Sequence, residues 1–247
     1  MELKNKTAII TGSTGKLTRH LTLGLARAGC NCLCHYYQNN SEAQSLVKKI
    51  KSLGCQAIAV QADLTKNEGI EKLFAAATEF VLPQILINSA AIFERKPLEK
   101  VTFENAQKTF NLNLTAAIMM CKYFAKKVKH NFGPSDAPIA KIINITDVGA
   151  IKPWADYILY CSSKAGLLGA TKALAKELAP AICVNAIAPG IVSANADFEM
   201  DEKKRQLAFI PAARFGTAVE VAQAVKFLIE NDYITGQTLN IDGGRSI

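Results

Sequence analysis

Long apolar runs are missing from this sequence of 247 residues. No segment approaches the roughly 20 consecutive apolar residues that a membrane-spanning helix needs, and the opening Met-Glu-Leu-Lys-Asn-Lys is too polar for a signal peptide. Pro-rich linkers and low-complexity segments are missing as well, which predicts one domain over residues 1–247. We therefore expect a cytoplasmic protein that does not bind membranes.

Cysteine spacings typical of metal sites are also missing. The seven cysteines include no Cys-x-x-Cys pair, and three of them, Cys30, Cys32 and Cys34, alternate along one expected strand. Alternation puts the three thiols on one face of the strand, which is a poor tetrahedral cage. We expect buried core residues in a reducing compartment, with no metal and no disulfide.

Positive charge is in excess but is not clustered. The chain has 29 Lys and Arg against 21 Asp and Glu, and the basic residues are spread over several expected helices without interleaved aromatic residues. We therefore expect no nucleic-acid partner. An excess of positive charge also helps to collect anionic small molecules.

Short β-branched runs alternate with helix-like segments along the chain. The expected strands are Thr7–Thr11, Cys30–Tyr36, Ala57–Ala62, Ile85–Asn88, Lys141–Thr146, Ile182–Ala188 and Gln237–Ile241. The expected helices are Leu17–Ala28, Glu42–Leu53, Asn67–Phe80, Phe103–His130, Tyr160–Leu178 and Val219–Glu230. Gly29 and Gly54 stand where a left-handed residue would end the first two helices. The alternation predicts an α/β class protein: a Rossmann-like, doubly wound parallel sheet of about seven strands with helices on both faces.

Small, polar or ionisable residues follow most of the expected strands. They are Gly12 onward, His35-Tyr36-Tyr37, Asp63, Asn88-Ser89-Ala90-Ala91, Thr146-Asp147 and Pro189-Gly190. A doubly wound sheet binds ligands outside the carboxyl ends of its strands, at the point where the strand order reverses. These residues are therefore expected to share one crevice.

Tyr160 and Lys164 are candidates for acid–base chemistry. A spacing of four on a helix puts the phenol and the ammonium on one face. A free tyrosine has a pKa of about 10, and a neighbouring cation lowers that value by stabilising the phenolate. The pattern favours Tyr160 as a general acid with a lowered pKa.

An ordered set of motifs resembles the short-chain dehydrogenase/reductase family. The set is Thr11-Gly12, Asp63, Asn88-Ser89-Ala90-Ala91, Asn113 in Asn111-Leu112-Asn113-Leu114, Tyr160 with Lys164, Pro189-Gly190, and Gly236-Gln237 with Asp242-Gly243-Gly244. The resemblance runs from about Lys6 to the C-terminus. It implies an NADP-type cofactor held by Thr11, Gly12, Lys16, Leu17, His35, Tyr36, Asp63, Leu64, Asn88, Ala90, Lys164, Pro189 and Gly190. It also implies a homotetramer, built on the helices 103–130 and 160–178, and a water held by Asn113 that links Lys164 to solvent.

Asp147 departs from the usual pattern of that family. Most members have a serine at this position, thirteen residues before the tyrosine, where it donates a hydrogen bond to a substrate carbonyl. An ionised aspartate can only accept. Pteridine reductases and dihydromonapterin reductases resemble this chain here, and also at Lys16, His35, Phe93 and the closing Asp242-Gly243-Gly244-Arg245. This resemblance implies NADPH-dependent reduction of a pterin or dihydropterin, with catalytic Asp147, Tyr160, Lys164 and Asn113 and a substrate held by Phe93, Asp147 and Tyr160.

The glycine loop after the first strand is incomplete. Lys16 and Thr18 stand where the second and third glycines of the family pattern fall. Within the resemblance, Lys16 is expected to pair with the 2′-phosphate of NADPH, because 35–39 contain no Asp or Glu to bind the ribose hydroxyls of NADH. Thr18 is expected to crowd the close contact that glycine allows, unless the loop shifts to use Gly15.

Other interpretations of the same residues stay open. Phe93 could be a core residue, Asp147 a turn cap, and His35 and Lys16 ordinary surface residues. A second function is a carbonyl reductase of the 3-oxoacyl-carrier-protein type, indicated by 210–217. A third is a nucleotide-binding scaffold with degraded catalysis, for which Thr18 is the support. The segment 193–213 is expected to be a substrate loop that orders on binding.

Overall fold

A single parallel sheet organises the protein. In the computed structural model, which describes residues 1–192 and 199–247, seven strands are hydrogen-bonded in the order β3-β2-β1-β4-β5-β6-β7. They are β1 (Thr7–Ile10), β2 (Asn31–Tyr36), β3 (Ala57–Gln61), β4 (Ile85–Asn88), β5 (Ala140–Ile145), β6 (Ile182–Pro189) and β7 (Thr238–Ile241). Every pairing is parallel. The predicted Rossmann-like fold class is confirmed.

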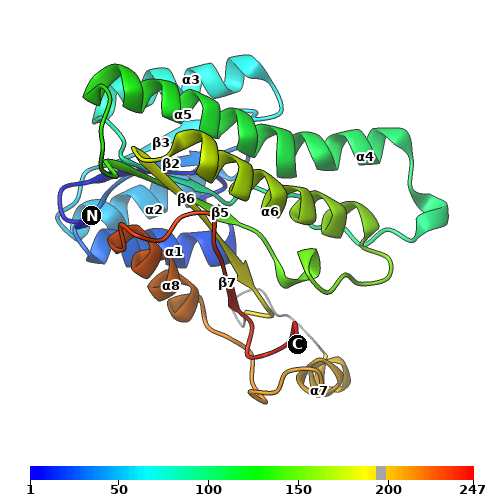
Figure 1. Cartoon of the computed structure of the whole chain (residues 1–247). Helices are drawn as coiled ribbons and strands as arrows, with labels where there is room; N and C mark the ends of the chain where they lie inside the picture. Colours follow the sequence, from blue (N-terminus) through cyan, green and yellow to red (C-terminus); the bar gives the residue numbers. More distant parts are fainter. Residues whose placement is uncertain (193–198) are drawn as a thin grey trace.

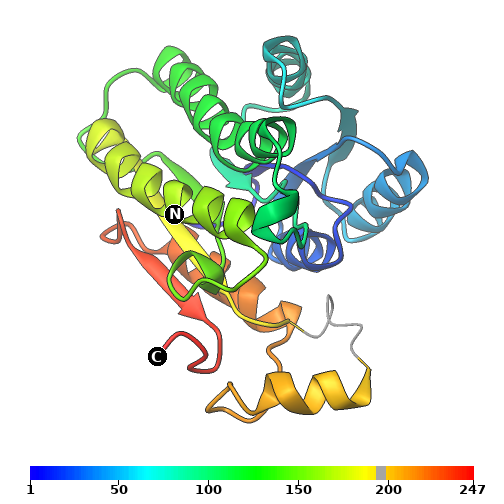
Figure 2. The same cartoon turned by 90° about the vertical axis from the view of Figure 1, so that its right-hand side faces the viewer.

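Helices cover both faces of the sheet (Figures 1 and 2). One face carries α1 (Lys16–Arg27), α2 (Asn40–Ser52) and α8 (Ala218–Glu230). The other carries α3 (Asn67–Phe80), α4 (Phe103–Phe110), α5 (Ala117–Phe132) and α6 (Ile158–Leu178). Among the described helices, none is long and apolar enough to cross a membrane.

Alternating strand residues pack into two separate hydrophobic cores, one on each face of the sheet. Ala8 and Ile10 pack into the cluster beneath α1, α2 and α8, whereas Ile9 packs into the cluster on the opposite face. Adjacent strand residues point to opposite faces, so a strand covered on both sides reads as a continuous apolar run. The thiols of Cys30, Cys32 and Cys34 are buried and free, and they share one face as predicted, which is the face covered by α1.

The helix and strand ends fall close to the predicted positions, with two larger differences. The long helix predicted over 103–130 is interrupted by a π-helical turn, η2 (Asn111–Ala116), between α4 and α5. A short helix, α7 (Met200–Leu207), lies within the segment predicted as a loop. Gly29 and Gly54 have left-handed φ values of +85° and +84°, as predicted for helix ends. The loop residues 193–198, with Asp197 and Phe198, lie outside the described residues.

The strand order reverses between β1 and β4. β1 pairs with β2 on one side and with β4 on the other. The loops that leave the carboxyl ends of β1 and β4 therefore diverge to opposite faces and leave a crevice between them. The residues at these strand ends form the floor of the site described next.

Candidate active site

Gly12 begins the loop between β1 and α1 in a conformation that other residues rarely adopt. Its φ is +65°, and a Cβ added there would lie 2.9 Å from the Cα of Ala90. The backbone N–H groups of Ser89 and Ala90 both donate to Oγ1 of Thr11, at 2.9 and 3.0 Å. Thr11 thus ties the end of β4 to the end of β1, and only glycine fits the close approach that results.

His35 supports the same loop from behind. Its side chain is 2% exposed; Nδ1 accepts from the N–H of Gly12 at 3.1 Å, and Nε2 lies 3.1 Å from the carbonyl of Ala62. Burial lowers the pKa of His35 to about 4. The imidazole is therefore neutral, with the Nε2 proton donated to Ala62. The surface interpretation of His35 is wrong, because both ring nitrogens are used inside the protein.

A cleft of about 470 Å³ opens above these loops. The residues that line it are Gly15, Lys16, Leu17, Thr18, Ser89, Ala91, Phe93, Ile145, Thr146, Asp147, Trp154, Tyr160, Lys164, Pro189, Gly190, Ile191 and Val192. The first turn of α1 faces it, preceded by Gly15, which has no side chain to cap the free backbone amides. An uncapped helix N-terminus beside a glycine loop suits an anionic group, so the cleft fits the diphosphate of a dinucleotide.

Thr18 takes part in a contact that the sequence did not predict. Its hydroxyl lies 2.7 Å from the hydroxyl of Ser89, across the floor of the cleft. The side chain is 5% exposed. Thr18 therefore joins the loops that follow β1 and β4 instead of leaving the open space of a glycine. Gly15 closes the turn, with its N–H donated to the carbonyl of Gly12 at 3.1 Å.

Asp147 and Tyr160 meet in the cleft. Asp147 follows β5 and begins η3 (Val148–Ala150), where its Oδ1 accepts from the N–H of Gly149 at 2.7 Å. Its other oxygen, Oδ2, accepts from the hydroxyl of Tyr160 at 2.8 Å. The turn-cap interpretation of Asp147 is therefore correct for one oxygen, while the second oxygen is directed at the phenol.

Both members of this pair have raised pKa values. Burial raises the pKa of Asp147. Burial, together with the neighbouring Asp147 charge, raises the pKa of Tyr160 well above its usual range. The prediction that Lys164 lowers the pKa of Tyr160 is wrong, because desolvation and the carboxylate both disfavour the phenolate more than the ammonium favours it.

Lys164 lies on the same face of α6 as Tyr160, but its ammonium bonds to a backbone carbonyl and not to the phenol. Its Nζ donates to the carbonyl of Ile145 at 2.8 Å and lies 5.9 Å from the centre of the Tyr160 ring. Burial lowers the pKa of Lys164 to about 8. A largely charged ammonium at neutral pH, beside a carboxylate and a phenol, makes this a site for proton transfer.

Asn113 clamps the loop after β4 to α6. Its Oδ1 accepts from the N–H of Ile92 at 2.7 Å, and its Nδ2 donates to the carbonyl of Ile92 at 2.9 Å and to Oγ of Ser163 at 3.0 Å. Ser163 in turn donates to the carbonyl of Tyr160 at 2.7 Å. The π-helical turn η2 places Asn113 for these bonds. The water expected between Asn113 and Lys164 stays a prediction.

Aromatic rings form one wall of the cleft. Phe93 is 60% exposed, so its interpretation as a core residue is wrong. Its ring stacks on Tyr157, with centroids 5.0 Å apart, and meets the edge of Tyr160 at 4.7 Å. Trp154 lies parallel to Tyr160 at 6.5 Å. Sequence reasoning missed Trp154 and Tyr157, although their place between Asp147 and Tyr160 could have indicated them.

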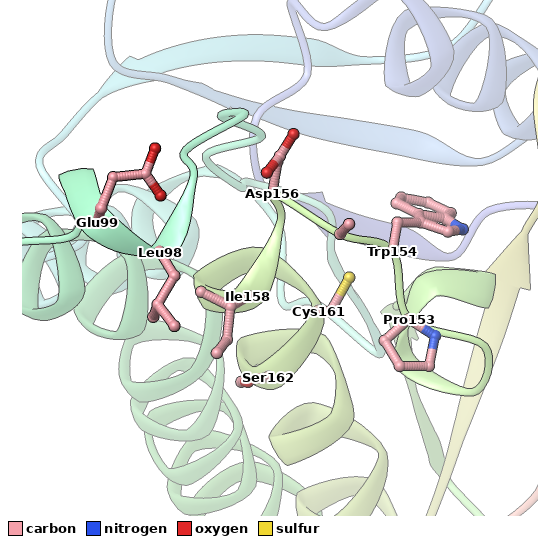
Figure 3. Close-up of a pocket in the computed structure, with 9 residues that line it drawn as sticks. Leu98, Glu99, Pro153, Trp154, Asp156, Ile158, Cys161 and Ser162 are labelled. Carbon is pink, nitrogen blue, oxygen red and sulfur yellow. The ribbon is translucent and has the colours of Figure 1, made fainter.

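A second hollow, of about 650 Å³, shares Trp154 with the cleft, and Figure 3 shows the residues that line it. It is lined by Leu98, Glu99, Pro153, Trp154, Ala155, Asp156, Ile158, Cys161 and Ser162. Trp154 is the residue that contributes to the linings of both hollows.

The other predicted cofactor residues are divided between the cleft and the interior. Lys16, Leu17, Pro189 and Gly190 line the cleft together with Lys164. The side chains of Tyr36, Leu64 and Asn88 are buried in the protein. Asn88 bonds Asn144 at 2.9 Å, Tyr36 donates to Asn40 at 2.7 Å, and Asp63 accepts from Thr65 at 2.6 Å.

Comparison with known proteins agrees with this geometry. A family model described as enoyl-(acyl carrier protein) reductase matches residues 17–246. The chain belongs to the short-chain dehydrogenase/reductase family. Members of this family depend on NAD(P), in agreement with the fit of the cleft and with the predicted NADPH.

Relatives within this short-chain dehydrogenase/reductase family have different activities. A 3-oxoacyl-[acyl-carrier-protein] reductase of Synechocystis is 34% identical, over 98% of this chain and 97% of the relative. The 3beta-hydroxysteroid dehydrogenase 1 of Eggerthella lenta is 35% identical, over 100% of this chain and 95% of the relative. The structure of FolM alternative dihydrofolate reductase 1 from Brucella canis, complexed with NADP, has a TM-score of 0.88 at 26% identity, over 100% of this chain and 96% of that one.

Proposed function

We propose that this chain is an NADPH-dependent reductase of a pterin or dihydropterin, acting on a C=N bond of the ring. The observation that carries the proposal is the Asp147 carboxylate in the cleft, hydrogen-bonded to the Tyr160 hydroxyl at 2.8 Å. A carboxylate accepts hydrogen bonds, and a pterin offers an amino group and ring N–H donors that a ketone lacks. Asp147 therefore selects for the heterocycle.

The pair formed by Asp147 and Tyr160 supplies the proton. Because both pKa values are raised, the pair retains a proton near neutral pH and can release it to a ring nitrogen that gains negative charge. NADPH supplies the hydride. Lys164, buried beside the pair, compensates the negative charge that remains after the proton leaves.

Phe93 and the other rings of the wall orient the substrate. An exposed ring at the edge of a cleft offers a flat apolar face, and aromatic pairs prefer offset stacking or edge contacts. Phe93 is held by its stack on Tyr157 and by the Asn113 clamp on the preceding residue. A planar pterin would lie against this ring, with its polar edge toward Asp147.

The preference for NADPH is assigned to Lys16. Lys16 lies exposed at the start of α1, on the lining of the cleft. The dipole of α1 favours the diphosphate, and the Lys16 ammonium adds a charge for the 2′-phosphate. The end of β2 and the residues after it, 36–39, contain no acidic side chain that would repel this phosphate.

Reduction of a 3-oxoacyl thioester is the second candidate. The names of the curated relatives favour it over pterin reduction, since a 3-oxoacyl-[acyl-carrier-protein] reductase is 34% identical over nearly the full length. A steroid dehydrogenase is equally similar, at 35%, so similarity at this level does not select a substrate. Asp147 opposes this candidate, because an ionised carboxylate next to a substrate carbonyl oxygen repels it.

The experiment that separates the two is NADPH oxidation by the purified protein. Dihydrobiopterin and dihydromonapterin are compared with an acetoacetyl thioester, and kcat/KM is measured for each. We expect the dihydropterins to be favoured by about a hundredfold, equivalent to roughly 2.7 kcal/mol of transition-state stabilisation. A preference for the thioester would overturn the proposal and support the second candidate.

We also propose a homotetramer built on α4, α5 and α6, as expected for the family. Exposed apolar side chains on these helices support it, among them Phe103, Ile118 and Ile158. The expected cytoplasmic location stays a prediction.

A further inference from the structure

Phe93 lies on a loop that is tied down on both sides of the ring. The preceding residue, Ile92, exchanges two backbone hydrogen bonds with the Asn113 side chain, at 2.7 and 2.9 Å. Further along the loop, the N–H of Lys96 donates to the carbonyl of Asp156 at 2.6 Å. Asp156 lies two residues before α6, and Figure 1 shows the segment ahead of α4 beside the start of that helix. The exposed ring of Phe93 therefore projects from a backbone that is fixed at two points.

Asp156 also binds this loop through its side chain. Its Oδ2 accepts from Nε of Arg95 at 3.1 Å and from Nη2 of Arg95 at 2.6 Å. The side chain of Arg95 is 69% exposed and that of Asp156 is 30% exposed. Two donors of one guanidinium that converge on a carboxylate fix the direction of the contact. Together with the backbone bond of Lys96, this ion pair forms a clasp between the loop after β4 and the loop before α6.

Asp156 has a backbone conformation that few residues adopt. Its φ is +66°, in the left-handed region where aspartate and asparagine are the commonest residues after glycine. Such a conformation costs free energy and persists where the surrounding bonds impose it. Trp154 stands two residues before Asp156 and Tyr157 directly after it, and Figure 3 shows Trp154 and Asp156 on the loop that leads into α6. A change in the backbone at Asp156 would therefore redirect two rings at once.

The rings carried by the two loops contact one another beside the clasp. Phe93 stacks on Tyr157 with centroids 5.0 Å apart and meets Trp154 edge-on at 6.5 Å. Trp154 in turn meets Tyr157 edge-on at 5.8 Å. Phe93 and Trp154 line the cleft together with Tyr160, whereas Asp156 lines the second hollow. The clasp thus holds two rings of the cleft wall from a position next to the cleft.

We propose that Arg95 and Asp156 are positioning residues for the substrate: the clasp between them holds Phe93 and Trp154 at the angle at which a flat heterocycle packs against the wall. A wall that is already in place lowers the cost of ordering it when the substrate binds. A planar ring needs this fixed angle for offset stacking, whereas a flexible chain can adapt to a displaced wall. The position of the rings is independent of the proposed pterin activity, while the effect on the substrate rests on that activity.

Tryptophan fluorescence tests the position of the wall without any substrate. Trp154 is the one tryptophan of the sequence, so the emission reports on this loop. Arg95→Met and Asp156→Gly should shift the emission to longer wavelength and increase its quenching by acrylamide, at an unchanged melting temperature. Glycine adopts a left-handed φ freely, so Asp156→Gly removes the carboxylate without straining the backbone. Lys226→Met, which removes an exposed ion pair with Glu230 on α8, is the control and leaves the emission unchanged.

Steady-state kinetics test the effect of the clasp on the substrate. We expect the KM for a dihydropterin to rise about fivefold in Arg95→Met, the upper range for an exposed ion pair. The kcat and the NADPH affinity should stay the same, because the clasp acts on the wall and not on the Asp147–Tyr160 pair. The double variant Arg95→Met/Asp156→Gly should raise KM no further than either single variant, because both residues act through one shared bond. The KM for an acetoacetyl thioester should stay near the wild-type value.

Each outcome decides one part of the proposal. Wild-type emission and quenching of Trp154 in both single variants would overturn the positioning of the rings. A shifted emission with an unchanged KM for the dihydropterin, or an equal rise in KM for the thioester, would overturn the role in substrate binding. A KM in the double variant that rises by the product of the two single factors would show that Arg95 and Asp156 act separately. If the wild type turns over no dihydropterin, the proposed function fails, while the emission still decides whether the clasp positions the wall.

Discussion

The nucleotide side and the substrate side of the cleft are held together by different kinds of contact. On the nucleotide side, formed by the loops after β1 and β4, backbone groups bond to Thr11 and His35, and Gly12 is fixed by its φ. On the substrate side, side chains contact side chains, as in Tyr160 with Asp147 and Phe93 with Tyr157. If the proposed function holds, cofactor binding depends on contacts that are part of the fold, whereas substrate choice depends on a few replaceable side chains.

This difference predicts different consequences of mutation. A change on the nucleotide side disturbs backbone bonds that also hold β1 to β4, and it should lower both stability and cofactor affinity. A change on the substrate side removes a side-chain contact at the rim of the sheet, and it should alter turnover while leaving stability and NADPH binding nearly unchanged.

Tyr160→Phe is expected to have the largest effect. Removing the hydroxyl removes the proton donor of the pair, and kcat should fall by about a thousandfold, within the usual range for a general acid. NADPH affinity, measured by fluorescence titration, should stay the same. Tyr157→Phe is the matched control, because it keeps the stacked ring beside Phe93. If Tyr160→Phe lowered NADPH affinity as well as kcat, the nucleotide side and the substrate side of the cleft would not be independent.

Gly12→Ala should destabilise the nucleotide side. A left-handed φ costs a non-glycine residue about 1–2 kcal/mol, and the clash with Ala90 at 2.9 Å adds about 1–3 kcal/mol of overpacking. Gly54→Ala is the matched control: its φ is +84°, and no described atom lies within 4 Å of an added Cβ. Urea unfolding should therefore show the larger loss for Gly12→Ala, together with loss of NADPH binding. Equal losses in the two variants would contradict the role of the close approach.

His35 should make the stability of the nucleotide side sensitive to acid. Its pKa falls from 6.5 to about 4 on folding, so the unfolded chain binds a proton more readily. The stabilising contribution of neutral His35 to the free energy of unfolding is fully present above pH 6.5 and is lost as the pH falls toward 4. Urea unfolding of the wild type should lose about 2–3 kcal/mol more than His35→Asn between pH 7 and 4.5. The same pH dependence in both proteins would rule out the buried neutral imidazole.

Lys16→Ala is expected to have the smallest effect, confined to cofactor choice. Loss of one ammonium near the 2′-phosphate should lower the preference for NADPH over NADH by about tenfold. Lys72→Ala, a change at an exposed lysine on α3, is the control for lost net charge. The ratio of kcat/KM for NADPH and NADH is the measurement. An unchanged ratio in Lys16→Ala would show that Lys16 does not contribute to the preference for NADPH.

The centre of the sheet was predictable because β1, β4, β5 and β6 are buried on both faces. The run Ile85-Leu86-Ile87 is entirely apolar in the sequence, and every one of its residues is buried in β4. The π-helical turn at Asn113 was not predictable, since one extra residue in a long amphipathic helix barely changes its periodicity. Helix α7 was missed for a related reason: it buries none of its residues, so it leaves no apolar stripe to detect.

The sequence predicted which residues lie on the cleft better than it predicted the pKa shifts of those residues. Asp147, Tyr160, Lys164 and Phe93 lie together on the cleft, but the sign of the pKa shift at Tyr160 was wrong. That sign depends on burial and on a carboxylate oxygen at 2.8 Å, neither of which the spacing to Lys164 reveals. Arg245 contacts Gln206 because the C-terminal turn folds back onto α7, a contact that no local pattern shows.

The most direct test of the account is the substrate preference of Asp147→Ser. Serine donates to a carbonyl, whereas the carboxylate accepts from a pterin. Dihydropterin turnover should fall by about a hundredfold or more, while turnover of an acetoacetyl thioester stays the same or rises and NADPH affinity is unchanged. Undiminished dihydropterin turnover in Asp147→Ser would contradict the claim that this carboxylate sets the substrate class.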